Sequence, residues 1–227
     1  MCGRYTMHHS PEELLERFGV VQTVMEATKR YNIAPSQSIN VVVTDGRTDA
    51  RVLDSFKWGL VPSWADDPKI GNRMINLRSE TVAEKRSWDR IVTRRRCVIP
   101  SDGFFEWQAV QGGGKQPVYF RRKDGDLFGF AGLWDTWRPP DGLPLHTCTI
   151  LTTSANLTVG AIHTRMPVIL LPGVAEATWL DPSVTTTAAL LPLLVPYPDT
   201  LLEGVPVSKR VNTPLVDDPS LIEAIAV

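Results

Sequence analysis

The chain of 227 residues is 43% hydrophobic and 22% charged, with a formal net charge of -1 at pH 7. This length suffices to bury a core, and the balanced charge excludes a uniformly basic surface, so any nucleic-acid binding needs a local basic groove. Three widely spaced cysteines, no apolar leader and no run long enough for a membrane span predict a cytoplasmic protein that spans no membrane.

The first predicted element is a short helix between Ser10 and Gly19. Ser10 can cap the helix, Pro11 suits its first turn, and Glu13 completes a capping box with Ser10. Gly19 favours a left-handed C-terminal cap, where the helix should end.

Strand-like runs dominate the rest of the chain. Residues 39–43 and 51–58 flank an Asp45-Gly46 turn and predict a hairpin, and Gly112 to Gly114 predict a second hairpin loop. Other strands are predicted over 97–100, 104–110, 118–121, 127–134, 146–152, 167–171 and 205–207, and helices over 79–92, 174–180 and 221–225. We therefore expect one α+β domain over residues 1–227, with a curved, partly closed, mainly antiparallel sheet and surrounding short helices.

Cys2 carries the most distinctive chemistry in the sequence. If Met1 is removed, Cys2 presents a free α-amine and a thiol on adjacent carbons. An α-amine has a pKa of about 7.7–8.0, so an appreciable fraction is neutral near pH 7 and able to attack an aldehyde. The thiol can then close onto the imine carbon to give a five-membered thiazolidine.

Three other polar residues stand in contexts that suit catalysis. Asn76 lies in a polar stretch that leads into a predicted helix, and Glu106 lies in an aromatic strand, where burial would raise its pKa toward that of a general acid or base. His163 precedes a predicted strand in a loop-like position, where site residues often occur.

Seven segments, in order along nearly the whole chain, together resemble the SRAP family, the SOS-response-associated peptidases, which are also described as abasic-site processing proteins. The segments are Met-Cys-Gly-Arg-Tyr at 1–5, Arg-Tyr-Asn-Ile-Ala-Pro at 30–35, Trp-Gly-Leu-Val-Pro-Ser-Trp at 58–64, Ile-Asn-Leu-Arg-Ser-Glu-Thr at 75–81, Pro-Ser-Asp-Gly-Phe-Phe-Glu-Trp at 100–107, Ile-His-Thr-Arg-Met-Pro at 162–167 and Val-Ser-Lys at 207–209.

The resemblance implies a covalent mechanism on abasic sites in single-stranded DNA. Cys2 would be the nucleophile, Asn76 would orient it, Glu106 would position the amine and move protons, and His163 would act as acid and base on the deoxyribose. The family's peptidase label implies release of Met1 by self-processing, and the imine implies a weak lyase activity.

The resemblance also implies a set of residues that bind the DNA strand. Arginines would hold phosphates, and flat side chains would support bases. Some relatives carry tandem aromatics where this chain has Trp64-Ala65, which leaves the base-wedging role open. The expected DNA-binding residues are Arg4, Asn32, Pro35, Trp64, Arg78, Thr152 and Ser208.

Two other functions remain open at this level: an N-terminal-cysteine amidohydrolase or peptidase on small amides, and a non-catalytic binder of single-stranded DNA. No cofactor is expected, and no metal, because His8, His9 and Cys2 lack a convincing ligand spacing. We expect a monomer associated with the nucleoid, with replication-associated proteins as possible partners.

Overall fold

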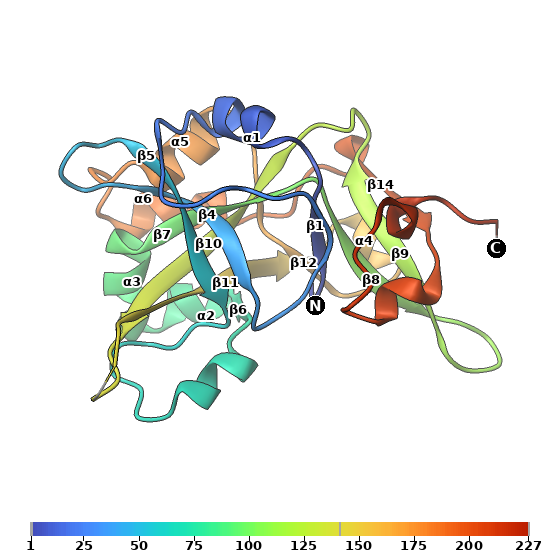
Figure 1. Cartoon of the computed structure of the whole chain (residues 1–227), viewed down its shortest axis with the longest axis horizontal. Coiled ribbons are helices and arrows are strands. Elements are labelled where there is room, and N and C mark those ends of the chain that lie inside the picture. The colour runs from blue at the N-terminus through green and yellow to red at the C-terminus, as the bar shows by residue number, and fades with distance from the viewer. Residues whose placement is uncertain (1, 141, 227) are drawn as a thin grey trace.

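Two β-sheets pack around a shared hydrophobic core in the computed structural model, which describes residues 2–140 and 142–226 (Figure 1). Within these residues the smaller sheet has five strands in the order β14-β9-β8-β1-β3, and β1 runs between the two sheets in the view of Figure 1. Its strands are β14 (Leu202–Pro206), β9 (Lys115–Arg122), β8 (Gly103–Ala109), β1 (Tyr5–Met7) and β3 (Arg30–Ile33).

The larger sheet closes on itself. Its path runs β12-β11-β10-β7-β4-β5-β2, and β5 also pairs with β11 in parallel, so five strands, β4, β5, β7, β10 and β11, form a ring. This confirms the predicted partly closed, mainly antiparallel sheet. The strands are β12 (Arg165–Pro167), β11 (Leu145–Ser154), β10 (Phe128–Trp137), β7 (Arg96–Ser101), β4 (Ser38–Thr44), β5 (Arg51–Trp58) and β2 (Gln22–Thr23), with β13 (Ile169–Leu170) on β10 and β6 (Asn76–Arg78) on β11.

Short helices surround the sheets, as the α+β prediction requires. The first, α1 (Pro11–Phe18), has the predicted capping box between Ser10 and Glu13, and Gly19 adopts the left-handed conformation at φ 60°. The other α-helices are α2 (Ser79–Glu84), α3 (Asp89–Arg94), α4 (Leu157–Gly160), α5 (Val174–Leu180) and α6 (Thr187–Leu190). The 3₁₀ helices are η1 (Pro68–Arg73), η2 (Arg86–Trp88), η3 (Leu191–Leu193), η4 (Asp199–Leu201), η5 (Lys209–Asn212) and η6 (Pro219–Ile222). No helix among the described residues combines the length and apolarity needed to cross a bilayer.

Two predicted helices differ from the structure. The helix expected over 79–92 is divided into α2, η2 and α3, because Lys85 takes an extended conformation with ψ 106° between them. The break still lets Val82 and Ile91 enter the core while Trp88 packs against it. The helix expected over 221–225 is only the 3₁₀ turn η6, which Asp218 caps.

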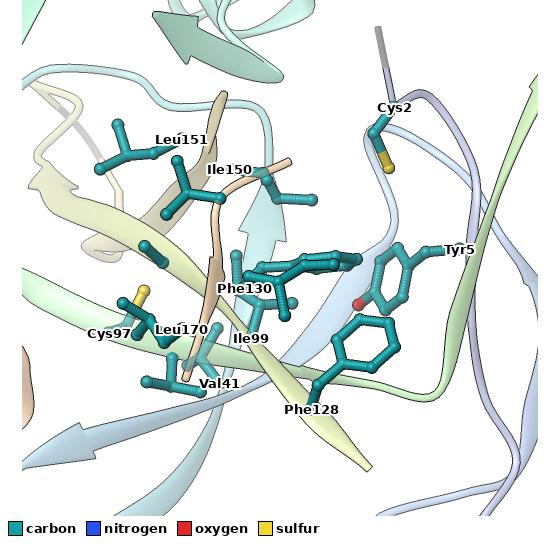
Figure 2. Close-up of a cluster of buried hydrophobic side chains, with 14 of the residues drawn as sticks. Cys2, Tyr5, Val41, Cys97, Ile99, Phe128, Phe130, Ile150, Leu151 and Leu170 are labelled. Carbon is teal, nitrogen blue, oxygen red and sulfur yellow. The ribbon is translucent and has the colours of Figure 1, made fainter. Parts of the chain in front are cut away.

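Successive side chains of β8 and β9 point to opposite faces of the sheet, which produces two separate apolar layers. Phe104 and Phe120 stack at 5.2 Å on the inner face, where they join the main core. Phe105 and Tyr119 face outward and are covered by the C-terminal segment through a second cluster that includes Val211. Figure 2 shows the main core with Cys2 at one end, its sulfur directed toward the side of Tyr5.

An ion pair between buried Arg165 and half-exposed Glu80 joins helix α2 to strand β12. Nη1 and Nη2 of Arg165 donate to the two oxygens of the Glu80 carboxylate, at 2.6 and 2.8 Å, and Nη2 also donates to Thr152 O at 2.6 Å. These hydrogen bonds lower the pKa of Glu80 to about 2. The pair fixes the start of β12, which follows His163 directly.

Gly103 is predicted to tolerate no side chain, because a Cβ there would lie 2.2 Å from the Tyr119 ring. Gly103→Ala should lower the free energy of unfolding by about 1–3 kcal/mol, measured by urea denaturation. Gly46→Ala is the matched control, since nothing lies within 4 Å of its Cβ, and it should change stability by about 0.5 kcal/mol or less. Equal effects of the two substitutions would contradict this packing.

Glu80→Gln should lower the free energy of unfolding at pH 7 by about 1 kcal/mol, because half-exposed Glu80 is partly screened by solvent. A carboxylate whose pKa is depressed in the folded state stabilises above its unfolded pKa of about 4.3 and loses that effect as the pH falls. The difference between wild type and variant should therefore shrink between about pH 4.3 and 2. Glu84→Gln, an exposed change on the same helix, should show no such pH dependence in the same denaturation series.

Candidate active site

The register between β1 and β8 brings Cys2 close to Glu106. Tyr5 pairs with Phe104, and the Phe105 amide donates to Arg4 O at 3.0 Å, which continues the antiparallel ladder toward the N-terminus. Each step back along β1 matches a step forward along β8, so the first residues of the chain approach Glu106. Two segments about a hundred residues apart thus form one wall of the site.

Cys2 is held by its backbone and has no exposed surface. Asn76 Nδ2 donates to Cys2 O at 2.7 Å, and Cys2 Sγ lies 3.7 Å from Arg4 O. Burial raises the pKa of the Cys2 thiol well above its usual range, and the charge of Glu106 adds to this effect. The thiol is therefore shielded from solvent in this arrangement. Met1 lies outside the described residues, so its removal stays a prediction.

Asn76 reaches Cys2 from a short strand that only the fold reveals. Strand β6 pairs in parallel with β11, with Asn76 opposite Ile150 and Arg78 opposite Thr152. Asn76 Oδ1 is buried and accepts no hydrogen bond from the described residues. It is therefore the atom of this side chain that remains available to an incoming donor.

Glu106 is almost fully buried, at 3% exposure, which decides between the exposed and buried positions that its aromatic strand left open. Burial raises the pKa of this carboxyl group, while the positive field of His163 opposes the increase. A carboxyl group poised in this way can hold a proton or release it nearer neutral pH than an ordinary glutamate.

His163 lies half-buried in the turn between α4 and β12. Its Nδ1 accepts the Arg165 backbone N–H at 3.0 Å and lies 3.2 Å from Arg165 O. Because Nδ1 supplies a lone pair to that amide, the neutral ring carries its hydrogen on Nε2. The neutral imidazole therefore has a defined donor nitrogen, whereas the protonated ring favours the ionised form of Glu106.

The structure thus brings the four expected catalytic residues into one region. Asn76 contacts Cys2 directly, while the electrostatic influences of Glu106 on Cys2 and of His163 on Glu106 connect the other two. An amine, a thiol, a carboxyl group and an imidazole in one region suit addition to a carbonyl and the proton transfers that follow.

Two arginines beside this region form no ion pair with a carboxylate of the described residues. Arg4 donates to Asn32 Oδ1 at 2.9 Å and to Val211 O at 2.6 Å, both uncharged acceptors. Arg78 is exposed, and within residues 2–140 and 142–226 it has neither an ion pair nor a side-chain hydrogen bond. Both guanidinium groups are therefore suited to bind phosphate.

Asn32 and Thr152 are both expected to line the channel for the DNA strand. In the structure both are fully buried. The Asn32 amide donates to three backbone carbonyls of the C-terminal segment, including Val216 O at 2.7 Å, and its oxygen accepts from Arg4. Thr152 Oγ1 lies 3.5 Å from Leu77 O. In this arrangement both side chains face protein groups, and Asn32 accepts a hydrogen bond from Arg4.

The remaining three expected DNA-binding residues lie at the surface. Trp64 is 70% exposed, which is unusual for an indole, and Pro35 is half-buried in the turn after β3. Ser208 is half-buried, and its hydroxyl caps η5 by accepting the Arg210 amide at 3.3 Å.

Sequence reasoning missed two groups of supporting residues. Arg165 belongs to the Ile-His-Thr-Arg-Met-Pro motif, but the motif does not show that its pairing with Glu80 anchors the turn that orients His163. Asp102 belongs to another motif, and the structure joins it to His8 and His9, whereas ligand spacing in the sequence groups those histidines with Cys2. In both cases the partner lies more than eighty residues away, so local patterns carried no signal.

Comparisons with known proteins show which family the chain resembles. The family model described as SOS response associated peptidase (SRAP) matches residues 1–214. The abasic site processing protein YoqW of Bacillus subtilis (strain 168) is 42% identical, covering 99% of this chain and all of that protein. The abasic site processing protein HMCES of Gallus gallus is 37% identical over 85% of this chain and 65% of its own length.

Solved structures share the same fold. A crystal structure of a protein from Bacteroides thetaiotaomicron superposes with a TM-score of 0.85 at 26% identity, covering 99% of this chain and all of that one. A phage-related protein from Bordetella bronchiseptica gives a TM-score of 0.71 at 28% identity, covering 92% of this chain and 95% of its own. With the family model spanning nearly the whole sequence, this chain belongs to the SOS response associated peptidase (SRAP) family.

Proposed function

We propose that this protein is an abasic-site processing protein that captures abasic sites in single-stranded DNA through a covalent bond to Cys2. One observation carries the proposal: Asn76 fixes the backbone of Cys2 at 2.7 Å in the same region as Glu106 and His163. Relatives named abasic site processing proteins, at 37–42% identity, support it.

The proposed reaction begins with the loss of Met1, which frees the α-amine of Cys2. The open-chain form of an abasic site exposes an aldehyde, and the neutral amine adds to its carbon. Loss of water gives an imine, and the thiol sulfur then adds to the same carbon while its proton passes to the nitrogen. The product is a thiazolidine, which lasts longer than an imine because both nitrogen and sulfur hold the carbon.

Glu106 and His163 have complementary tasks in this scheme. Buried Glu106 accepts a proton from the attacking amine and returns it to the hydroxyl that leaves as water. His163 offers its Nε2 hydrogen to the sugar oxygen, which assists ring opening. The same proton transfers run in reverse when the crosslink is released, and an imine that escapes closure would support weak lyase activity.

The DNA strand would be held by positively charged side chains around this region. Arg4 and Arg78 are proposed to bind the phosphates beside the lesion, because neither has a carboxylate partner among the described residues. Exposed Trp64 and Pro35 would offer flat faces to bases. Ser208, Asn32 and Thr152 would shape the channel from behind.

The proposal also covers the oligomeric state, the cellular location and the release of Met1. The protein would act as a monomer in the cytoplasm, at the nucleoid where single-stranded DNA arises. Release of Met1 by the protein's own thiol is proposed as the peptidase step that precedes crosslinking.

Cys2→Ala should abolish the denaturation-resistant complex with a single-stranded abasic oligonucleotide, reducing it by about 100-fold or more. Prepared without Met1, the variant keeps the α-amine of residue 2 but loses sulfur closure, so its imine should be trapped only when a hydride reductant is added. Intact mass spectrometry measures both the loss of Met1 and the mass of the adduct.

Cys97→Ala is the matched control, because Cys97 is also a buried thiol but lies in β7. It should crosslink like the wild type. A wild-type band in Cys2→Ala, or turnover of small amides without any DNA adduct, would overturn the proposal.

The rate of crosslinking should fall as the pH drops through the raised pKa of Glu106. Deprotonated Glu106 is the active base, so the decline should begin above the ordinary glutamate pKa of about 4.3. Glu106→Gln should not show this decline of the crosslinking rate toward low pH, and at pH 7 it should react about 100-fold more slowly. Initial-rate assays from pH 5 to 8 measure both effects. Glu84→Gln should keep the wild-type profile, and an unchanged profile in Glu106→Gln would exclude the assigned role.

A further inference from the structure

Next to the end of β1 lies a cluster that the proposed reaction does not use. We propose that His8, His9 and Asp102 form a binding site for a divalent metal ion of the zinc class. Each residue offers one ligand atom, and these atoms lie within 4.8 Å of one another. Among the described residues this is the group of histidine, cysteine and acidic side chains with that geometry.

The distances fit a tetrahedral ion. His9 Nδ1 lies 3.1 Å from Asp102 Oδ2, and His8 Nε2 lies 3.5 Å from Asp102 Oδ1. Zinc bonds to nitrogen or oxygen of about 2.0–2.1 Å in a tetrahedron separate neighbouring ligand atoms by about 3.3 Å. The two observed separations, one to each carboxylate oxygen, bracket this value, and ligand atoms taken one per residue all lie within 4.8 Å, so a reorientation of the rings would bring them to tetrahedral spacing.

Local structure explains why two consecutive histidines reach one carboxylate. Side chains that follow each other in a strand point to opposite faces, but β1 ends at Met7 and the chain bends before α1. The rings of His8 and His9 stack at 5.3 Å, and His8 also stacks on Tyr31 at 5.3 Å. Both imidazoles are therefore held in place beside Asp102.

The carboxylate is oriented by a second set of contacts. The backbone amides of His8 and His9 both donate to Asp102 Oδ2, and the Thr6 hydroxyl donates to Oδ1. Thr6 Oγ1 in turn lies 2.8 Å from the Tyr119 hydroxyl. Fixed outer contacts of this kind set the direction of a metal ligand and strengthen binding.

Exposure and charge also suit a bound cation. The Asp102 side chain is 1% exposed, whereas those of His8 and His9 are 27% and 19% exposed, so the cluster opens to solvent on one side. Water could supply the fourth ligand there. The Asp102 hydrogen bond raises the pKa of His9, with Glu13 and Asp126 adding negative field, while Lys29 acts on the His8 side.

Binding would exchange a proton for the metal. In the metal-free protein the hydrogen on His9 Nδ1 points to Asp102 Oδ2. The ion would take the lone pair of that nitrogen, and the hydrogen would move to Nε2, with any second proton released to solvent. The His8 ring must likewise be neutral when it acts as a ligand. Two imidazoles and a carboxylate favour Zn²⁺ over Mg²⁺ or Ca²⁺.

The ion would join the two strands that carry the active-site residues. His8 and His9 follow β1, which begins three residues after Cys2, while Asp102 precedes β8, which contains Glu106. A metal at this corner would therefore stiffen the β1–β8 pair without touching the reacting groups.

Titration of the full-length protein with zinc chloride in a calorimeter tests the site. Wild type should bind one equivalent, and the melting temperature should rise by about 5 °C with zinc in 100-fold excess over its Kd. His9→Ala should weaken binding by about 100-fold. His8→Phe should do the same while keeping a ring against Tyr31, which guards against misfolding.

Two controls separate this cluster from other zinc ligands. His146→Ala removes a histidine that packs against Phe56 and Trp134 in the ring, and Cys2→Ala removes the active-site thiol, so both should bind zinc like the wild type. X-ray absorption should show two imidazoles in the zinc shell. The absence of binding to folded wild type, equal affinity in His9→Ala, or loss of binding in Cys2→Ala would each overturn the proposal.

Discussion

Strand β1 is hydrogen-bonded on both sides, to β3 and to β8, and the arrangement of the site depends on this constraint. Chain ends usually fray, because they lack partners on at least one side. Here the paired strand fixes Cys2 against β6, where Asn76 binds its carbonyl oxygen, and places it near Glu106. A reactive terminal residue thereby gains the positional precision of an internal one.

That precision requires the C-terminal segment as well. Asn32 of β3 binds three carbonyl oxygens of that segment, and the Asp217 carboxylate accepts the backbone amides of Tyr31 and Asn32. Arg4 donates to Val211 O from the other direction. Both ends of the sequence thus meet at β3, and the guanidinium of Arg4 is oriented entirely by neutral oxygens, which leaves its charge uncompensated.

Local patterns predicted the elements well where the causes are local. The capping box of Ser10 and Glu13, the left-handed Gly19 and the hairpin around Asp45 each depend on residues a few positions apart, and all are confirmed. Local patterns could not predict the parallel pairing of β5 with β11 and of β6 with β11, because the paired strands are far apart in sequence. Lys85 divided a predicted helix through a backbone conformation that periodicity does not encode.

The same distinction applies to the site. Resemblance of short motifs suggested Cys2, Asn76, Glu106 and His163, which the fold brings into one region. It did not predict that Asn32 is buried, because a motif conveys residue identity but not whether a side chain faces solvent or protein. Nor did it reveal the partnership of Asp102 with His8 and His9, which depends on a bend after β1.

The order of the strands has a consequence for biosynthesis. Strand β1 emerges from the ribosome first, but its partner β8 ends at Ala109. At about 5–20 residues translated per second, roughly 5–20 s pass before that partner is complete. During this interval the amino terminus has no ladder to join, and Glu106, which lies in β8, is not yet in place. A self-processing step of the kind proposed would therefore begin only after the first half of the chain has been synthesised and the sheet has formed.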